Sequence, residues 1–188
     1  MLLLWILLGV AVLAAGYVIV TYNRLIASKN HVEEAWSDIQ VQMKRRYNLI
    51  PNLVETVKGY ANHERGTLED VVKARNLAAA NDGSPEEQAV SENLLSGALR
   101  HLFAVAEDYP ELKADSSFLN LQNELEEAEN LIQKARRYYN GHVRLLNTMI
   151  ESFPSNLVAN AFKFMKAQFF ELDEADAAAR QVPKVDFS

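Results

Sequence analysis

Four histidines are the first residues in this sequence whose chemistry could support a metal site; they stand at positions 31, 63, 101 and 142. Helical proteins often hold two iron ions through a Glu-x-x-His motif. The residues three positions before the histidines are Ser28, Tyr60, Ala98 and Tyr139, so that motif is absent. "HERG" at 63–66 begins like a zinc-protease helix, but no second histidine follows at the required spacing. We therefore expect no metal and no cofactor, and we interpret His142 as a core histidine.

Carboxylates and nucleophiles give no clearer sign of catalysis. "ELEEAEN" at 124–130 holds four glutamates, which fit either a cation site or an acidic, solvated helix face balanced by Lys134, Arg136 and Arg137. We favour the solvated face. The motif G-x-S-x-G does not occur, the seven glycines are scattered, and cysteine is absent. These features predict a protein that is not an enzyme, and the net charge of −6 argues against nucleic acid as a partner.

Two basic motifs are better candidates for function. "KRRYNLIPN" at 44–52 and "KARRYYN" at 134–140 each combine an arginine pair with tyrosine and asparagine. On antiparallel helices they could lie side by side, with arginine stacked on tyrosine or paired with glutamate. They could equally be two ordinary polar faces, or a docking patch for a partner or an anionic headgroup. The candidate interaction surface consists of Lys44, Arg45, Arg46, Tyr47, Asn48, Pro51, Arg136, Arg137 and Tyr138.

The first twenty residues predict a membrane anchor. Residues 2–20 carry no charge, twelve of them are Leu, Ile or Val, and as a helix they span roughly 28 Å, close to the thickness of the hydrocarbon core. A cleaved signal peptide and a buried core helix are the alternatives. We favour a retained anchor because no basic side chain precedes the apolar run. "LAAGY" at 13–17 resembles a lipoprotein processing box, but Tyr17 stands where the cysteine should be.

The charges beside the anchor predict its orientation. None precedes the apolar run, whereas Arg24 and Lys29 follow it, diluted by Glu33 and Glu34. The positive-inside rule then places the N-terminus outside and the body of the protein on the cytoplasmic side.

Beyond the anchor, apolar residues continue at heptad spacing and predict one long helix. The positions are Leu25, Val32, Trp36, Ile39, Met43, Ile50, Leu53, Val57 and Tyr60, with Arg46 filling one slot. The heptad phase is the same on both sides of Pro51, which favours a kinked but continuous helix. Proline removes the hydrogen bond to the carbonyl of Tyr47, so that oxygen is freed close to the arginine pair.

The remaining helices follow from capping signals. "TLED" at 67–70 predicts a capping box that opens a helix from Leu68 to about Ala80. In "NDGSPEE", Ser84 suits the N-cap of the next helix, Pro85 its first position and Glu87 its third, and this helix ends at "YPELKADSS". Asp115 or Ser116 then caps a helix of about 35 residues that ends near Phe153 and Pro154.

Together these signals predict an all-α protein in which an N-terminal transmembrane helix continues into an elongated antiparallel bundle of three to four long helices. We divide the chain into an anchor (1–21), a helical bundle (22–153), and a short helix with a loosely held tail (154–188). "FKFMKAQFF" at 162–170 holds four phenylalanines. This cluster fits packing across the end of the bundle or a foot on the membrane surface.

Several long segments of the chain resemble the LemA family. They are "YNRLIASKNHVEEAWSDIQVQMKRRYNLIPNLVETVKGYANHE", "YPELKADSSFLNLQNELEEAENLIQKARRYYN", "VRLLNTMIESFPSNLVANAFKF" and the closing "PKVDF". The resemblance covers residues 22–188. It implies a membrane-anchored, bacterial-type protein with an antiparallel helical body. Some members are implicated in membrane organisation and others are linked to membrane proteases, and the resemblance carries over no catalytic residues.

Two functional hypotheses follow. The first is a non-enzymatic, single-pass membrane protein that acts as a scaffold or adaptor in membrane organisation and self-associates as a homo-oligomer through its coiled-coil seam. The second is an accessory binding module or regulator of a membrane protease. The partners expected are membrane lipid, a second copy of the chain and, in the second case, the protease.

Overall fold

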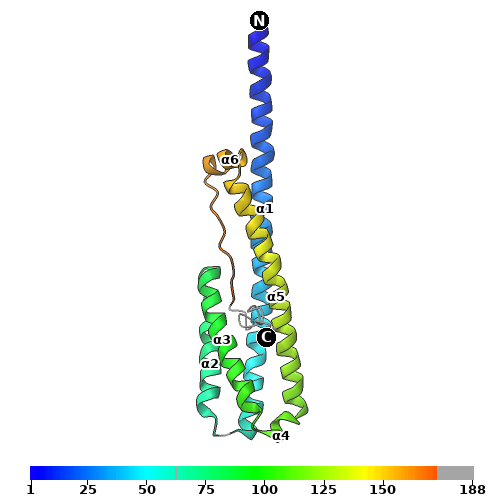
Figure 1. Ribbon diagram of the computed structural model, residues 1–188, viewed down its shortest axis with the longest axis vertical. Coiled ribbons are helices and arrows are strands. Elements are labelled where there is room, and N and C mark those ends of the chain that lie inside the picture. The colour runs from blue at the N-terminus through cyan, green and yellow to red at the C-terminus, as the bar shows by residue number, and fades with distance from the viewer. Residues whose placement is uncertain (62, 173–188) are drawn as a thin grey trace, which may run out of the picture. The chain divides into compact units, whose positions relative to one another are not determined.

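Helices are the regular secondary structure of the part that the computed structural model describes, residues 1–61 and 63–172 (Figure 1). The helices are α1 (Leu2–Tyr60), α2 (Arg65–Ala79), α3 (Pro85–Ala106), α4 (Pro110–Lys113), α5 (Ser116–Glu151) and α6 (Ser155–Ala161). No strand occurs within these two ranges. The predicted all-α class and its long helices are confirmed, whereas the expected tail beyond Leu172 lies outside the described residues.

The chain forms two compact units, and α1 and α5 contribute to both. Unit 1 combines Met1–Arg46 with Leu125–Phe169. Unit 2 combines Tyr47–Glu124 with the segment that starts at Phe170. Each unit is therefore built from segments that are distant in the sequence, and one helix passes from the first unit into the second at Arg46.

In unit 1 the first part of α1 packs antiparallel to the second part of α5. Arg46 contacts Glu129, the ring of Trp36 lies 5.3 Å from that of Tyr139, and the ring of His31 lies 5.3 Å from that of His142. The partner number rises along α5 as the number falls along α1, which defines the antiparallel register.

The predicted seam of α1 is buried almost as expected. Its buried members include Leu25, Val32, Ile39, Met43, Ile50, Leu53 and Val57, which are three, four or seven residues apart as a heptad seam requires. Two positions were wrong: Ala35 is buried in place of Trp36, and Ala61 in place of Tyr60, which is 40% exposed. Each alanine is one position away from the aromatic residue. Its small side chain therefore faces the core, and the aromatic ring lies at the edge of the core.

The start of α1 has the properties of a membrane span. Residues 1–20 are all exposed, and among the described helices α1 alone is long and apolar enough to cross a membrane. Pro51 lies inside α1, so the helix continues through the proline as predicted.

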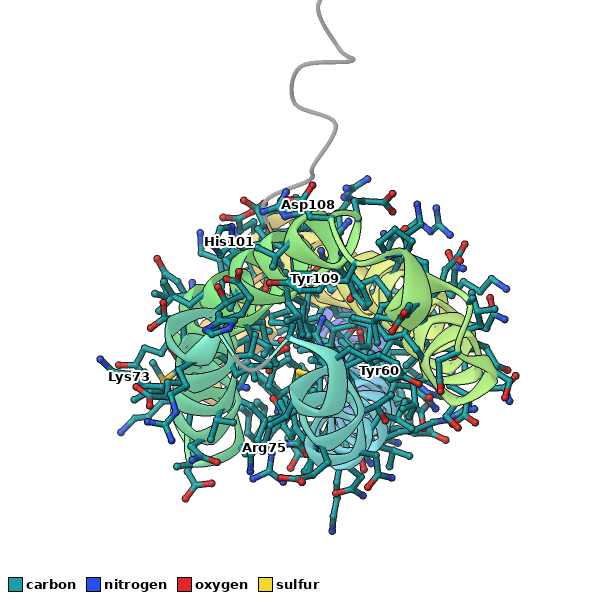
Figure 2. All side chains as sticks on the ribbon, turned by 90° about the horizontal axis from the view of Figure 1, so that it is seen from below. Tyr60, Lys73, Arg75, His101, Asp108 and Tyr109 are labelled. Atoms are coloured by element: carbon teal, nitrogen blue, oxygen red, sulfur yellow. The ribbon has the colours of Figure 1, made fainter. Side chains whose placement is uncertain are left out.

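Unit 2 consists of helices joined by short connections. The ring of Phe103 on α3 lies 6.2 Å from that of Phe118 on α5. At the end where α1 stops, the hydroxyl of Tyr60 donates to Asp115 at 2.9 Å and that of Tyr109 donates to Glu64 at 3.1 Å; Figure 2 labels both tyrosines. These bonds join the end of α1 and the start of α2 to the connection between α3 and α5.

Two of the three predicted helix starts are confirmed. Ser84 accepts from the amide of Glu87, while the Glu87 side chain accepts from the amide of Ser84, which completes a capping box at α3. Asp115 Oδ1 accepts from the amides of Ser117 and Phe118 at the start of α5. Helix α4 was not predicted.

The capping box predicted at Thr67 is wrong. Helix α2 begins two residues earlier, at Arg65, and Thr67 lies buried in its first turn. The amide of Leu68 bonds to the carbonyl of Glu64, which sets the earlier start. Glu64 makes no side-chain capping bond, because its carboxylate accepts the hydroxyl of Tyr109 instead.

A non-helical segment, residues 162–169, follows α6 and runs back along α5 in unit 1; we call it the strap. Asn147 holds the backbone of Ala167 with two bonds of 2.9 Å, accepting its amide and donating to its carbonyl. The hydroxyl of Tyr139 donates to the carbonyl of Gln168 at 2.8 Å. Burial raises the pKa of Tyr139 to about 12, so this hydroxyl stays protonated and remains a donor at neutral pH.

Candidate functional site

The carbonyl that Pro51 leaves without its helical partner is satisfied from another helix. Residue 51 has no N–H to donate to the carbonyl of Tyr47, four residues earlier. Arg75 Nε on α2 donates to that oxygen at 3.2 Å, and Figure 2 labels Arg75 on the side of α2 that faces the end of α1. The irregularity in α1 is therefore an attachment point for α2 in unit 2.

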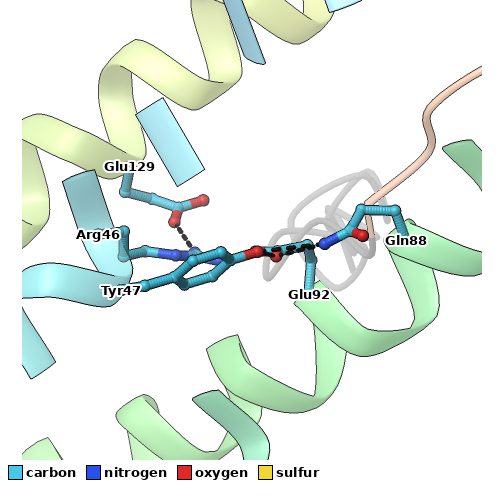
Figure 3. A network of polar contacts seen from close by, with 5 residues as sticks. All are labelled: Arg46, Tyr47, Gln88, Glu92 and Glu129. Atoms are coloured by element: carbon cyan, nitrogen blue, oxygen red, sulfur yellow. Dashed lines mark hydrogen bonds and ion pairs between the residues drawn. The ribbon is translucent and has the colours of Figure 1, made fainter. Parts of the chain in front are cut away.

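The side chain of the same tyrosine belongs to a buried polar cluster in unit 2. The Tyr47 hydroxyl donates to the carboxylate of Glu92, and Gln88 Nε2 lies 3.1 Å from the hydroxyl and 3.0 Å from Glu92 Oε1 (Figure 3). Gln88 Nε2 also lies 3.1 Å from the carbonyl of Ala78 at the end of α2. Glu92 is fully buried. Tyr47 thus joins α1 to α2 through its backbone and to α3 through its phenol.

In unit 1 the two arginines of the first motif pair with glutamates of α5. Arg46, 1% exposed, fills the seam slot and pairs with Glu129 (Figure 3). Arg45 donates to Glu127 at 2.8 Å, and both of these side chains are exposed. Glu127 and Glu129 of the acidic stretch therefore act as counter-charges for α1; the sequence allowed arginine to pair with glutamate but did not indicate which glutamates.

The second basic motif faces a different part of α1. Tyr139 contacts Trp36, and the ring of Tyr138 lies 4.5 Å from His142 on α5 itself. Arg136 is half-buried, and Arg137 and Tyr138 are exposed. In unit 1 the arginine pair at 45–46 lies against the glutamates that precede this motif, so unit 1 does not bring the two arginine pairs together.

Three further residues of the candidate surface remain accessible. Lys44 is exposed in unit 1, and Asn48 and Pro51 are exposed in unit 2. The candidate set therefore separates into two groups. Arg46 and Tyr47 are buried and join helices, while the other members leave side chains at or near the surface.

A groove of about 850 Å³ lies between the end of α1 and α2 in unit 2. Its apolar lining includes Val54, Leu68, Val72 and Leu77, and its charged lining consists of Glu55, Lys58, Arg65, Glu69 and Lys73. Val72 and Leu77 are 40% and 53% exposed. The sequence reading missed this groove, although two apolar side chains outside the buried face of α2 were a signal for it.

In 1–61 and 63–172, no three His, Asp or Glu side chains converge as a metal site requires. In unit 1, Arg45 and Arg46 of the first basic motif form ion pairs with Glu127 and Glu129 of α5, and in unit 2 the groove offers apolar area with a charged rim. Among these residues the arrangement is suited to holding helices together and to binding another surface.

The model of the LemA family matches residues 35–187, which is most of the sequence. The chain belongs to the LemA family. The resemblance found in the sequence is confirmed. The matched range starts after the apolar stretch and includes both basic motifs, the acidic stretch of α5 and the groove.

Three relatives are similar to this chain over most of its length. Protein LemA of Metamycoplasma hominis is 29% identical over 157 residues, which cover 82% of this chain and 70% of that protein. Magnetosome protein MamQ 2 of Paramagnetospirillum magneticum is 24% identical over 175 residues, covering 80% of this chain and 64% of that protein. Magnetosome protein MamQ of Magnetospirillum gryphiswaldense is 22% identical and covers 88% of this chain and 71% of that protein.

Proposed function

We propose that this LemA-family chain is a non-enzymatic, single-pass membrane protein that serves as a helical scaffold or adaptor in membrane organisation. The observation that carries the proposal is the continuity of α1, which runs from the exposed apolar stretch at 2–20 through Arg46 to Tyr60 without a break. A helix that is both anchor and bundle member transmits its position in the bilayer directly to the packed helices. The magnetosome relatives support a role in organising membranes.

The proposed topology places the N-terminus outside and the bundle in the cytoplasm, with membrane lipid as the first partner. Arg24 and Lys29 after the span support this orientation. Protease added to intact cells tests it: a tag at the C-terminus should survive until the cells are lysed. Cleavage from outside would place the bundle on the other side.

Self-association is part of the proposal, but the seam is a poor surface for it. Leu25, Val32 and Ile39 are buried within the chain, so they cannot face a second copy. The exposed apolar stretch offers another surface. Gly9 and Gly16 are seven residues apart on one helix face, and a Cβ atom at either glycine would meet nothing within 4 Å. Small residues of this kind allow transmembrane helices to approach closely.

Cross-linking in native membranes tests this homo-oligomer. We expect cross-linked dimers or larger species for the natural chain and their loss in Gly9→Ile/Gly16→Ile. Leu3→Ile, in the same stretch, is the matched control and should leave cross-linking unchanged. If the natural chain gives monomers alone, self-association is wrong while the membrane anchor still stands.

A second candidate function is an accessory module or regulator of a membrane protease, and the groove between α1 and α2 is the observation that favours it. Purification of the full chain from membranes should then recover a protease in near-stoichiometric amount. Leu77→Glu, which places a charge at the exposed rim of the groove, should abolish the recovery, while Val90→Glu on the exposed face of α3 should not. Recovery unaffected by Leu77→Glu would exclude the groove.

A further inference from the structure

The corner of unit 1 formed by the end of α5, by α6 and by the start of the strap exposes large apolar side chains. Phe153 is 79% exposed, Leu157 61%, Phe162 52% and Met165 85%. They come from a short stretch of sequence, and the buried side of the same corner is filled by Val158 and Ala159. Exposed apolar patches of this kind mark interaction surfaces in soluble and membrane proteins.

Aromatic contacts fix this corner against α1 at a defined position. The ring of Tyr22 lies 4.7 Å from that of Phe162 and 5.9 Å from that of Phe164. Thr21, which precedes Tyr22, is buried. All of these residues belong to unit 1, so the contacts place the corner beside the first turn of α1 after the apolar stretch at 2–20.

This position corresponds to the lipid headgroup region if α1 spans the bilayer. Tyr22 follows Val20 by two residues, a rise of about 3 Å along the helix. The headgroup layer extends roughly 5 to 8 Å beyond the hydrocarbon on each side. The rings of Phe162 and Phe164 are therefore held at the depth where aromatic side chains are enriched in membrane proteins.

Lys163 adds a charge suited to the same layer. It lies between the two phenylalanines with φ of 57°, in the left-handed region that favours glycine, and it follows the last turn of α6. The amides of Lys163 and Phe164 bond to the carbonyls of Asn160 and Ala159, which is the arrangement in which helices usually end on glycine. Lys163 is exposed and flanked by aromatic rings, so its stem can cover apolar surface while its charged end reaches lipid phosphates.

We propose that Phe153, Leu157, Phe162, Lys163 and Met165 form a foot that inserts into the surface of the same bilayer that α1 spans, with anionic phospholipid as its ligand. This inference rests on the proposed membrane anchoring. The foot gives unit 1 a second attachment to the membrane beside the span, so unit 1 is held at a defined angle to the bilayer rather than pivoting on one helix.

Single spin labels can locate the foot, because the chain contains no cysteine. Met165→Cys reports the foot, Leu13→Cys the span, and Val41→Cys an exposed site on α1 about 30 Å beyond the apolar stretch. All three side chains are more than half exposed, so the labels fit without repacking. The full chain is reconstituted in vesicles of phosphatidylcholine and phosphatidylglycerol. Collisions with oxygen, which concentrates in lipid, are compared with collisions with a water-soluble nickel chelate.

We expect an oxygen-to-nickel collision ratio at Met165→Cys that is several-fold higher than at Val41→Cys and lower than at Leu13→Cys. Leu157→Cys is a second reporter and should agree with Met165→Cys. A Met165→Cys ratio equal to that of Val41→Cys, with Leu13→Cys in lipid, overturns the foot and leaves the anchor intact. Protection of Met165→Cys from both reagents indicates a protein cover and also overturns it. A water-exposed Leu13→Cys overturns the anchor, which is the failure of the proposed function.

Discussion

Arg46 and Tyr47 are adjacent in α1, and each places a polar group at a buried position where apolar side chains are usual. Arg46 is buried in the seam, three residues after Met43 and four before Ile50, and it is paired with Glu129. The hydroxyl of Tyr47 donates a hydrogen bond to the fully buried carboxylate of Glu92. A buried charge or hydroxyl costs free energy unless a partner is held in place, so these residues specify which helices pack together as well as how firmly they pack.

The two glutamates that pair with the arginine motif should differ in their effect on stability. Glu129→Ala removes the partner of a buried guanidinium and should lower the free energy of unfolding by about 1–2 kcal/mol. Glu127→Ala removes an exposed partner and should cost no more than about 0.5 kcal/mol. Urea unfolding of the full chain in detergent, followed by circular dichroism, measures both. Equal losses would show that the burial of Arg46 does not matter.

At the scale of elements, the features that the sequence predicted correctly are those that depend on hydrophobic periodicity and on capping residues. The seam of α1, the box at Ser84 and the cap at Asp115 were readable because each depends on residues close together in the chain. The start of α2, the particular glutamates that pair with Arg45 and Arg46, and the strap were not, because each depends on a side chain brought from another element. Tyr109 takes the carboxylate of Glu64, and Asn147 holds the backbone of Ala167. The freed carbonyl of Tyr47 was predicted, but its partner Arg75 was not.

Pro51 and Arg75 should be energetically coupled through the carbonyl of Tyr47. In the natural chain Arg75→Met leaves the Tyr47 carbonyl without a donor and should cost about 1–2 kcal/mol. In Pro51→Ala the new N–H of residue 51 can bond to this oxygen, so Arg75→Met should cost about 1 kcal/mol less in that background. Lys73→Met, on the same helix, is the control and should show no coupling. A double-mutant cycle by urea unfolding gives the value, and a coupling near zero would mean that Arg75 is not a substitute for the helical donor.

The cap at Asp115 predicts a pH dependence of stability. The amide of Phe118 and then the hydroxyl of Tyr60 hold the pKa of Asp115 below its ordinary value of 3.8. A lowered pKa means that the folded state favours the charged form, so the stabilisation is present above pH 3.8 and is lost as the pH falls through the lowered pKa. The natural chain should exceed Asp115→Asn in stability at pH 7, and this difference should shrink below pH 3.8.

Unfolding of both proteins between pH 7 and pH 2 measures the effect of Asp115. Asp115→Ser, which keeps a neutral N-cap, serves as the control and should follow Asp115→Asn at every pH. A difference between the natural chain and Asp115→Asn that is constant with pH would contradict the role of the charge.

For the molecule as a whole, the anchor and the packed helices make separable contributions. Residues 1–20 are exposed and Thr21 is buried, so the packed structure begins where the apolar stretch ends. The apolar stretch therefore makes no buried contact, and the stability of the fold depends on the rest of the chain.

Removal of residues 1–20 should consequently leave the fold intact. We expect the midpoint of urea unfolding to change little and the free energy of unfolding to change by no more than about 0.5 kcal/mol, because no buried contact is lost. Circular dichroism should show a loss of helix equal to the residues removed. A larger loss of helicity, or a much lower midpoint, would show that the span supports the packing of α1.

The division of the chain into two units also has a consequence for synthesis on the ribosome. Unit 2 is built almost entirely from one continuous stretch, Tyr47–Glu124, and can pack soon after it emerges. Unit 1 needs Leu125–Phe169, which is made last, to cover a helix that was made first. Until then the seam residues Leu25, Val32 and Ile39 remain uncovered by α5. The chain therefore passes through an interval, several seconds long at about 5–20 residues per second, in which chaperones have access to a surface that the finished protein conceals.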